Sequence, residues 1–223
     1  MPVVPILTRV GSKKPIRDLV KRKSPSDYTF YIEPFVGSGA VYFYLDIGDT
    51  PAVISDLDSD LINAHKIIKS NPSIDNLSKY ENMTDSRVDA LINKKRTNGS
   101  LEKLAQYTAR TSGTFGGKPA KADKKGNYKV YKYADISTKL KRIPDNADYM
   151  KNTLVLNQDY KTVIKKYDRA GAFIYLDPPY QDSNGLYDFP DMDFEEMADV
   201  LAKVKGKFLM SINDSPEIRK IFK

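Results

Sequence analysis

Short apolar runs bounded by polar or glycine residues recur along the chain, separated by segments whose apolar residues fall at helical spacing. Each run has the length of a buried strand. Strands that alternate with helices predict a three-layer α/β fold with a mostly parallel, Rossmann-like sheet. The predicted strands lie at residues 31–32, 52–55, 153–156, 172–176 and 208–212.

Helical spacing predicts the elements that cover this sheet. We expect a helix over residues 14–21, opened by Pro15, with Ile16, Leu19 and Val20 facing inward. Further helices are predicted at residues 41–45, around Val163 and Ile164, around Phe194, Met197, Ala198 and Leu201, and at 216–222.

The strand pattern stops in the middle of the chain. From about residue 63 to 150, short helical patches alternate with loops rich in Asn, Gly and Lys. Residues 124–127 form a turn candidate that leads into residues 128–133, one possible arm of a hairpin. We therefore expect residues 1–62 and 151–223 to form one domain, with 63–150 as an insert.

The predicted strand at residues 172–176 runs directly into Asp177-Pro178-Pro179-Tyr180. Open α/β sheets bind their ligands at the carboxyl edge, and the prolines make a stiff turn there. A planar ring with an amino group could stack on Tyr180 and donate hydrogen bonds to Asp177 and the Pro178 carbonyl. This arrangement suits methylation of an exocyclic amine, whereas an ordinary strand–turn with a packing tyrosine is the alternative.

Residues 33–40, Glu-Pro-Phe-Val-Gly-Ser-Gly-Ala, predict a strand that enters a glycine turn. Glycines allow close approach of a ligand and backbone angles closed to other residues. Tyr42 stands at the third glycine position of the dinucleotide motif, so no NAD site is predicted. Asp56 ends the next strand about 20 residues later, where a carboxylate can accept hydrogen bonds from a ribose.

Composition excludes several kinds of chemistry. The chain has no cysteine, which rules out a disulfide scaffold, a thiolate metal site and methylation at cytosine carbon 5 through a cysteine nucleophile. Its single histidine, His65, falls among apolar residues at helical spacing, which predicts a packing role and no metal site. No run approaches the about 18 apolar residues of a membrane span, and no signal peptide is evident. We expect an intracellular protein, in the cytoplasm or in a host cell.

The net charge of +7 is concentrated in the middle third, where Lys and Arg alternate with tyrosines. Lys and Arg neutralise phosphates and supply most sequence-independent affinity for DNA. A solvated charged face is the alternative. The expected DNA-binding residues are Arg110, Lys118, Lys124, Lys125 and Tyr131.

Taken together, these motifs resemble the Dam-like (D12 class) adenine-N6 DNA methyltransferases, which use S-adenosylmethionine. The resemblance covers nearly the whole chain except the insert, where it thins to residues 110–117. It implies that Asp177, Pro178, Pro179 and Tyr180 are catalytic, that Asp56 binds the cofactor's ribose and that Asp159 binds its adenine amine. The cofactor-binding residues that it implies are Gly11, Lys13, Glu33, Pro34, Phe35, Gly37, Ser38, Gly39, Asp56, Asp159, Tyr160 and Asp177.

The chain departs from the family pattern in two places. Arg9 stands where the family usually carries a tryptophan, and Val10 and Ser12 replace an alanine and a glycine. Family members normally continue past the strand at 208–212 with a final hairpin. We therefore expect either that those carboxyl-terminal strands are missing here or that the sheet edge is completed in another way.

The resemblance implies that one adenine is rotated out of duplex DNA, because its amine cannot be reached inside the stack. The loop at residues 181–187 is expected to close over the extruded base. Two alternatives stay open: the same chemistry on cytosine N4 or on adenine in RNA, and an inactive DNA-binding protein with a methyltransferase fold. The sequence leaves the target sequence and the oligomeric state undetermined.

Overall fold

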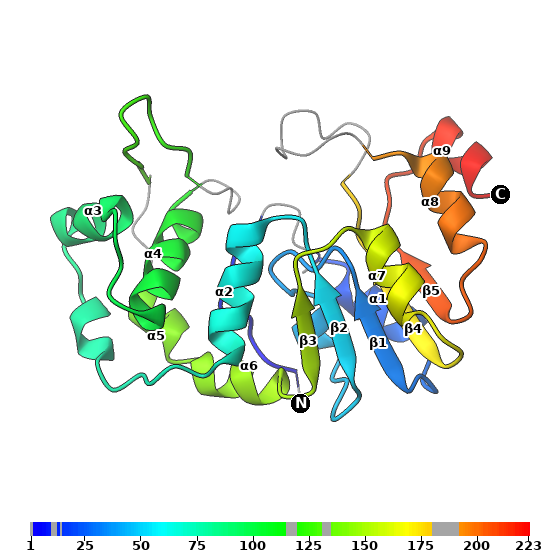
Figure 1. The fold of residues 1–223 in the computed structure, drawn as a ribbon, viewed down its shortest axis with the longest axis horizontal. Coiled ribbons are helices and arrows are strands. Elements are labelled where there is room, and N and C mark those ends of the chain that lie inside the picture. Colours follow the sequence, from blue (N-terminus) through cyan, green and yellow to red (C-terminus); the bar gives the residue numbers. More distant parts are fainter. Residues whose placement is uncertain (1, 10–12, 14, 115–119, 131–134, 180–191) are drawn as a thin grey trace.

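The computed structural model describes residues 2–9, 13, 15–114, 120–130, 135–179 and 192–223. These residues contain a five-stranded sheet in the order β3-β2-β1-β4-β5, in which each neighbouring pair is parallel. The predicted α/β fold is confirmed (Figure 1). The strands are β1 (Phe30–Glu33), β2 (Ala52–Ser55), β3 (Thr153–Leu156), β4 (Ala172–Leu176) and β5 (Lys207–Met210).

The strand register places alternate residues on opposite faces of the sheet. Ile32 pairs with Val53 and Ile174, and these three side chains belong to one core cluster. Tyr31 and its partner Phe173 belong to the other. Both faces of β1 and β4 are buried, which explains why these strands read as continuous apolar runs.

Helices cover both faces. On the face of Ile32 lie α7 (Tyr160–Tyr167), α8 (Phe194–Leu201) and α9 (Pro216–Ile221), which contribute to the same core cluster. On the other face lie α1 (Arg17–Lys23), the 3-10 turn η1 (Tyr42–Tyr44) and α2 (Ser59–Lys69).

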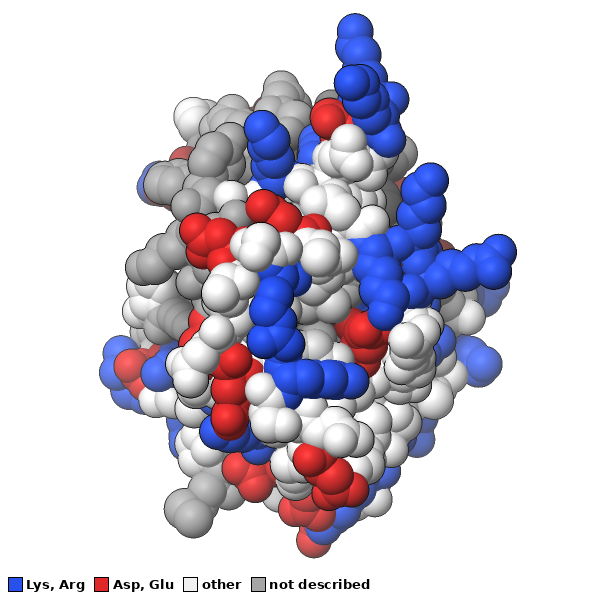
Figure 2. All heavy atoms as spheres, turned by 90° about the vertical axis from the view of Figure 1, so that its left-hand side faces the viewer, with Lys and Arg blue, Asp and Glu red and all other residues white. Residues whose placement is uncertain are grey.

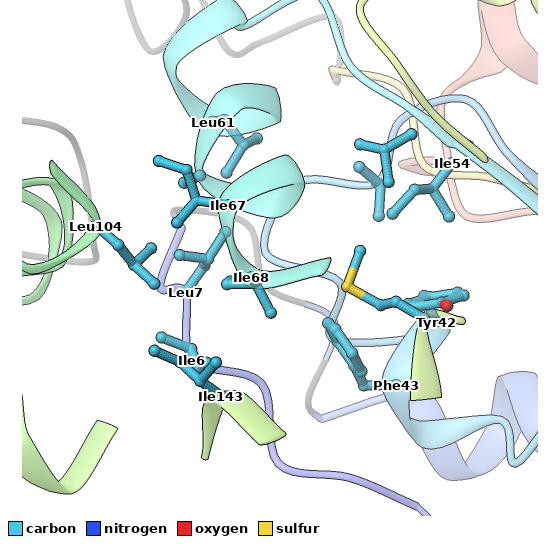
Figure 3. Close-up of a cluster of buried hydrophobic side chains, with 14 of the residues drawn as sticks. Ile6, Leu7, Tyr42, Phe43, Ile54, Leu61, Ile67, Ile68, Leu104 and Ile143 are labelled. Carbon is cyan, nitrogen blue, oxygen red and sulfur yellow. The ribbon is translucent and has the colours of Figure 1, made fainter. Parts of the chain in front are cut away.

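The insert packs beyond α2, away from the sheet (Figure 1). Its core is continuous with that of the sheet, because Ile6 and Leu7 of the amino-terminal segment lie among side chains of α2, α4 and α6 (Figure 3). The predicted domain boundary at residue 62 falls within α2. The insert elements are η2 (Leu77–Tyr80), α3 (Asp85–Asn93), α4 (Ser100–Ser112), α5 (Ile136–Leu140) and α6 (Ile143–Tyr149).

Two predicted helices differ from the structure. The helix expected over residues 14–21 is α1, which begins at Arg17, and its Leu19 is 46% exposed, so the inward orientation of Leu19 is wrong. Only Val20 of this helix is buried. The helix expected at residues 41–45 is the single turn η1, because Asp46 adopts a positive φ of 54° that cannot continue a helix.

The predicted turn at residues 124–127 is present. Asp123 Oδ1 accepts hydrogen bonds from the backbone N–H groups of Lys125 and Asn127, and Gly126 has a φ of +82°. Ala122 and Tyr128 form an antiparallel bridge across this turn, which projects beyond α3 and α4 (Figure 1). Within the described segments, no helix has the length and apolarity that crossing a membrane requires.

Candidate active site and cofactor site

Three carboxylates lie at or just beyond the carboxyl ends of neighbouring strands. Glu33 is the last residue of β1, Asp56 follows β2 and Asp177 follows β4. Because β2, β1 and β4 are parallel neighbours, these ends meet at one edge of the sheet. The parallel topology therefore brings together three acidic residues that are up to 144 positions apart in the sequence (177 − 33).

The glycine turn, residues 36–40, lies beyond β1. Gly37 and Gly39 have φ angles of +48° and +74°, which favour glycine. A Cβ at Gly39 would come within 2.7 Å of the Phe43 ring, whereas one at Gly37 would meet only Arg9 Cγ, at 4.0 Å. Both packing and backbone conformation therefore require a glycine at position 39. At Gly37 the space beside the backbone is open, so a ligand could approach the turn there.

Asp56 holds the glycine turn in place. Its Oδ2 accepts a hydrogen bond of 3.0 Å from the Gly37 N–H, and its Oδ1 accepts one of 3.0 Å from the Asp58 N–H. Asp58 in turn caps α2 by accepting from the N–H groups of Asp60 and Leu61, and it forms an ion pair with Arg9. Burial raises the pKa of Asp56. The Asp56 carboxylate therefore orients the turn in addition to any ligand that it binds.

Glu33 is 2% exposed and accepts a hydrogen bond of 2.6 Å from the Tyr31 hydroxyl. Burial raises the pKa of Glu33 well above its usual range, and the charges of Asp177 and Asp56 raise it further. Pro34 and Ser38, two of the implied cofactor-binding residues, are also buried. Glu33, Pro34 and Ser38 are thus buried at and beyond the end of β1.

Asp177, which follows β4, is a largely buried acidic residue. Burial raises the pKa of Asp177 to about 6, although the nearby Lys13 ammonium lowers it. Lys13 Nζ lies 2.6 Å from Asp177 Oδ1, and the two side chains are 13% and 17% exposed. Lys13, which the resemblance implied to be a cofactor-binding residue, thus pairs with the implied catalytic carboxylate. Pro178 is buried, and Pro179 is partly buried.

The other end of the site is formed by the residues between β3 and α7. Asp159 caps α7, with its two oxygens accepting from the N–H and the hydroxyl of Thr162. The ring of Tyr160 stacks on Phe35 with centroids 5.5 Å apart. Gln158 Oε1 is buried and has no hydrogen-bond partner in the described part of the chain. Aromatic side chains with a few polar groups are typical of small-molecule sites in general.

Several predicted site residues lie outside the described residues: Gly11, Lys118, Tyr131 and Tyr180, as does the loop at 181–187. Among the rest, the structure brings Glu33, Gly37, Asp56 and Asp177 together. No group of three or more His, Asp or Glu side chains in the described segments is arranged to hold a metal ion.

His65 has a contact that sequence reasoning missed. It is completely buried in α2, as a packing residue would be, but its Nε2 lies 2.8 Å from the Gly37 carbonyl oxygen. The sequence did contain one indication of this contact, because an imidazole stands at a position where the helical spacing predicts an apolar side chain. The spacing alone could not identify its partner, which is 28 residues away.

The basic residues of the insert divide into two groups. One group is engaged inside the protein: Arg110 donates to the Ile92 carbonyl and lies 3.8 Å over the Tyr128 ring, and Lys94 pairs with Glu102. The other is exposed on the insert, whose outer face carries Lys and Arg side chains interspersed with acidic ones (Figure 2). The exposed ones include Lys95, Arg96, Lys124, Lys125 and Lys129.

The site chemistry fits a nucleoside with a cationic group. The glycine turn leaves room for close approach beside Gly37, and the partly exposed Phe35 ring stacks on the buried Tyr160 ring. The acidic side chains of Glu33, Asp56 and Asp177 gather at the strand ends. The residues present therefore fit a cofactor such as S-adenosylmethionine.

Comparison with known proteins gives consistent results. Residues 10–223 match the profile of the family described as D12 class N6 adenine-specific DNA methyltransferases. The Type II methyltransferase M.MjaIII of Methanocaldococcus jannaschii is 28% identical, over 96% of this chain and 85% of that protein. M1.LlaDCHI of Lactococcus lactis subsp. cremoris is 26% identical, over 79% of this chain and 65% of that protein. M.CviBI of Paramecium bursaria Chlorella virus NC1A is 23% identical, over 89% of this chain and 78% of that protein. The last two are also Type II methyltransferases.

Proposed function

The chain belongs to the D12 class of N6 adenine-specific DNA methyltransferases, which methylate adenine in DNA, and we propose that it does so at the carboxyl edge of its sheet, with Asp177 as the amine-binding carboxylate. The observation that carries this assignment is the ion pair between Lys13 and Asp177. An amine already lies against this largely buried carboxylate. The target N6 amine also donates hydrogen bonds, and it would bind the same carboxylate beside Lys13.

Asp177 and the Pro178 carbonyl each accept one hydrogen of the target amine. This draws the nitrogen toward tetrahedral geometry and directs its lone pair at the methyl group. A carboxylate with a pKa of about 6 is also a better proton acceptor than an ordinary aspartate, and it is still mostly ionised at neutral pH. Alignment of the reactants can supply up to roughly 7–11 kcal/mol of the acceleration.

Enzymes of this family generally use S-adenosylmethionine, which supplies a methyl group activated by its sulfonium charge. In our proposal, the glycine turn approaches its methionine portion and Asp56 accepts from its ribose. Phe35 packs against the adenine near Asp159, with the buried Tyr160 ring stacked behind it.

The DNA-binding surface is proposed to be the exposed part of the insert, residues 63–150. Lys124 and Lys125 stand at the tip of the projecting turn, and Lys95 and Arg96 lie between α3 and α4. Flipping of the target adenine and its stacking on Tyr180 are the remaining parts of the proposal, because an amine inside a stacked duplex cannot reach Asp177. Since the substrate is DNA, we propose that the enzyme acts inside cells.

The experiment is transfer of a radiolabelled methyl group from S-adenosylmethionine to plasmid DNA, followed by digestion to nucleosides and chromatography. N6-methyladenine is the expected product. Asp177→Ala should reduce product formation to the background level while DNA binding persists. A label on cytosine N4, or transfer that survives in Asp177→Ala, would contradict the proposal.

A further inference from the structure

We propose that His65 is a positioning residue for the methyl donor: it holds the glycine turn in the shape that binds S-adenosylmethionine. This inference rests on the proposed function, in which the turn contacts the donor. His65 belongs to α2 and is completely buried. It would therefore act through its contact with Gly37 and would not touch the donor itself.

The geometry shows Gly37 held from both sides. The His65 ring lies 2.8 Å from the Gly37 carbonyl oxygen through Nε2, and the Gly37 N–H donates to Asp56. A carbonyl oxygen can only accept, so Nε2 must carry the proton. Gly37 is thus fixed by one donor and one acceptor, in a backbone conformation that is uncommon for other residues.

His65 also lies against the second glycine of the turn. A Cβ at Gly39 would be 3.6 Å from His65 Cε1. The first turn of α2 is tied to the same structure, because Asp58, its capping residue, donates its N–H to Asp56. Asp56 and His65 therefore connect α2 to the turn at two points, and a change at His65 should alter the turn more than the helix.

Packing alone does not explain a histidine here. His65 Nδ1 is buried and has no hydrogen-bond partner among the described residues. An unpaired buried polar atom costs free energy that a leucine of similar size would avoid. Burial lowers the pKa of His65 to about 4, so the ring is neutral at physiological pH and carries one proton, which the carbonyl of Gly37 uses. A residue that is unfavourable for the core but matched to a site is expected where function determines the choice.

Two substitutions separate positioning from packing. His65→Gln keeps a side-chain N–H that can reach the Gly37 carbonyl, whereas His65→Leu fills the space without a donor. Ile68→Val is the control, because Ile68 is fully buried in the same helix. The measurement is equilibrium binding of S-adenosylmethionine to the full chain by calorimetry, with thermal unfolding of each variant alongside.

We expect His65→Leu to bind the donor about tenfold or more weakly, as expected for the loss of one well-placed hydrogen bond. His65→Gln should recover most of the affinity, and Ile68→Val should bind as the wild type does. Equal binding by His65→Leu and wild type would overturn the inference and leave the proposed function intact. A wild-type protein that does not bind the donor would instead contradict the proposed function.

A second measurement covers the case in which His65→Leu does not fold. His65 is the single histidine of the chain, so its imidazole nitrogens give one unambiguous pair of ¹⁵N signals. We expect the neutral tautomer with the proton on Nε2, and a shift of these signals when S-adenosylmethionine is added to the wild type. A proton on Nδ1, or signals unchanged at saturating donor, would overturn the inference.

Discussion

The Lys13 ammonium lies 2.6 Å from Asp177 Oδ1, so the carboxylate that follows β4 is paired with an amine from the amino-terminal segment. The pairing opposes the effect of burial on Asp177, which otherwise favours the neutral acid. Lys13 therefore keeps Asp177 ionised at a pH where a buried carboxyl would begin to take up a proton. This relationship underlies the first two predictions.

The first prediction concerns the pH dependence of activity. Since the pKa of Asp177 is about 6 and the ionised form is the acceptor, kcat/KM should fall as the pH drops through about 6. Lys13→Met removes the charge that lowers this pKa, so the acid limb should move to higher pH. Lys23→Met, at an exposed position in α1, is the control. An acid limb that is identical in all three proteins would contradict the role of Lys13.

The second prediction concerns stability. The pKa of Asp177 is about 6 in the folded protein but about 3.9 when unfolded, so stability falls as the pH rises from about 4 to about 6. At neutral pH the charge costs about 2–3 kcal/mol by this relation. Asp177→Asn should therefore raise the melting temperature at pH 7.5, and the gain should disappear below about pH 4.

Asp214 supplies the matched control for this experiment. It is exposed, and its hydrogen bond with Arg219 lowers its pKa. Asp214→Asn should therefore give no gain in stability at neutral pH. A melting temperature that is unchanged or lower in Asp177→Asn would show that the ionised Asp177 side chain does not destabilise the folded protein.

The third prediction compares two glycines. Gly39 and Gly48 both have positive φ angles, of 74° and 59°, but a Cβ at Gly39 would meet the Phe43 ring whereas one at Gly48 would meet nothing within 4 Å. Gly48→Ala should cost about 1–2 kcal/mol of unfolding free energy, from the backbone alone. Gly39→Ala should cost more and should also weaken binding of S-adenosylmethionine. Chemical denaturation and calorimetry measure the two effects, and equal costs would argue against the packing constraint at Gly39.

The fourth prediction concerns salt. Lys124 and Lys125 are exposed at the tip of the turn that projects from the insert. The logarithm of the DNA-binding constant falls linearly with the logarithm of the salt concentration. If each lysine contacts a phosphate, Lys124→Ala and Lys125→Ala should each make this slope shallower by about 0.9. Lys203→Ala, at an exposed position beyond α8, should leave the slope unchanged. Slopes measured by fluorescence anisotropy that do not distinguish the three variants would remove the turn from the DNA-binding surface.

The fifth prediction concerns how this turn is attached. The Asn93 side chain accepts from the Tyr128 N–H at 2.6 Å and donates to the Tyr128 carbonyl at 3.3 Å, while Arg110 lies on the Tyr128 ring. Asn93→Leu removes both hydrogen bonds, so the Tyr128 amide should exchange with solvent faster and DNA should bind more weakly. Binding of S-adenosylmethionine should not change. Asn98→Ala, at an exposed position, is the control, and unchanged Tyr128 exchange in Asn93→Leu would exclude this attachment.

The sequence by itself was sufficient for the sheet and for the strand ends. The apolar runs at β2 and β4 predict the observed bounds because strands buried on both faces have no polar residues among their apolar ones. The run at β3 also matches its strand, although Leu154 is 43% exposed. Asp56 and Asp177 follow such runs directly, so a parallel sheet leaves them at one edge. The resemblance of the motifs to the family then indicated the activity, methylation of adenine in DNA.

The tertiary structure decided which polar groups pair. Nothing local in the sequence links His65 to Gly37, Lys13 to Asp177 or Asn93 to Tyr128, because each contact joins separate elements. The charge pattern likewise could not show that Arg110 is engaged with Ile92 while Lys124 is exposed. Hydrophobic periodicity reports which face of an element is buried, but hydrogen bonds and ion pairs depend on the distances that packing sets between elements, and these arise only when the whole chain is folded.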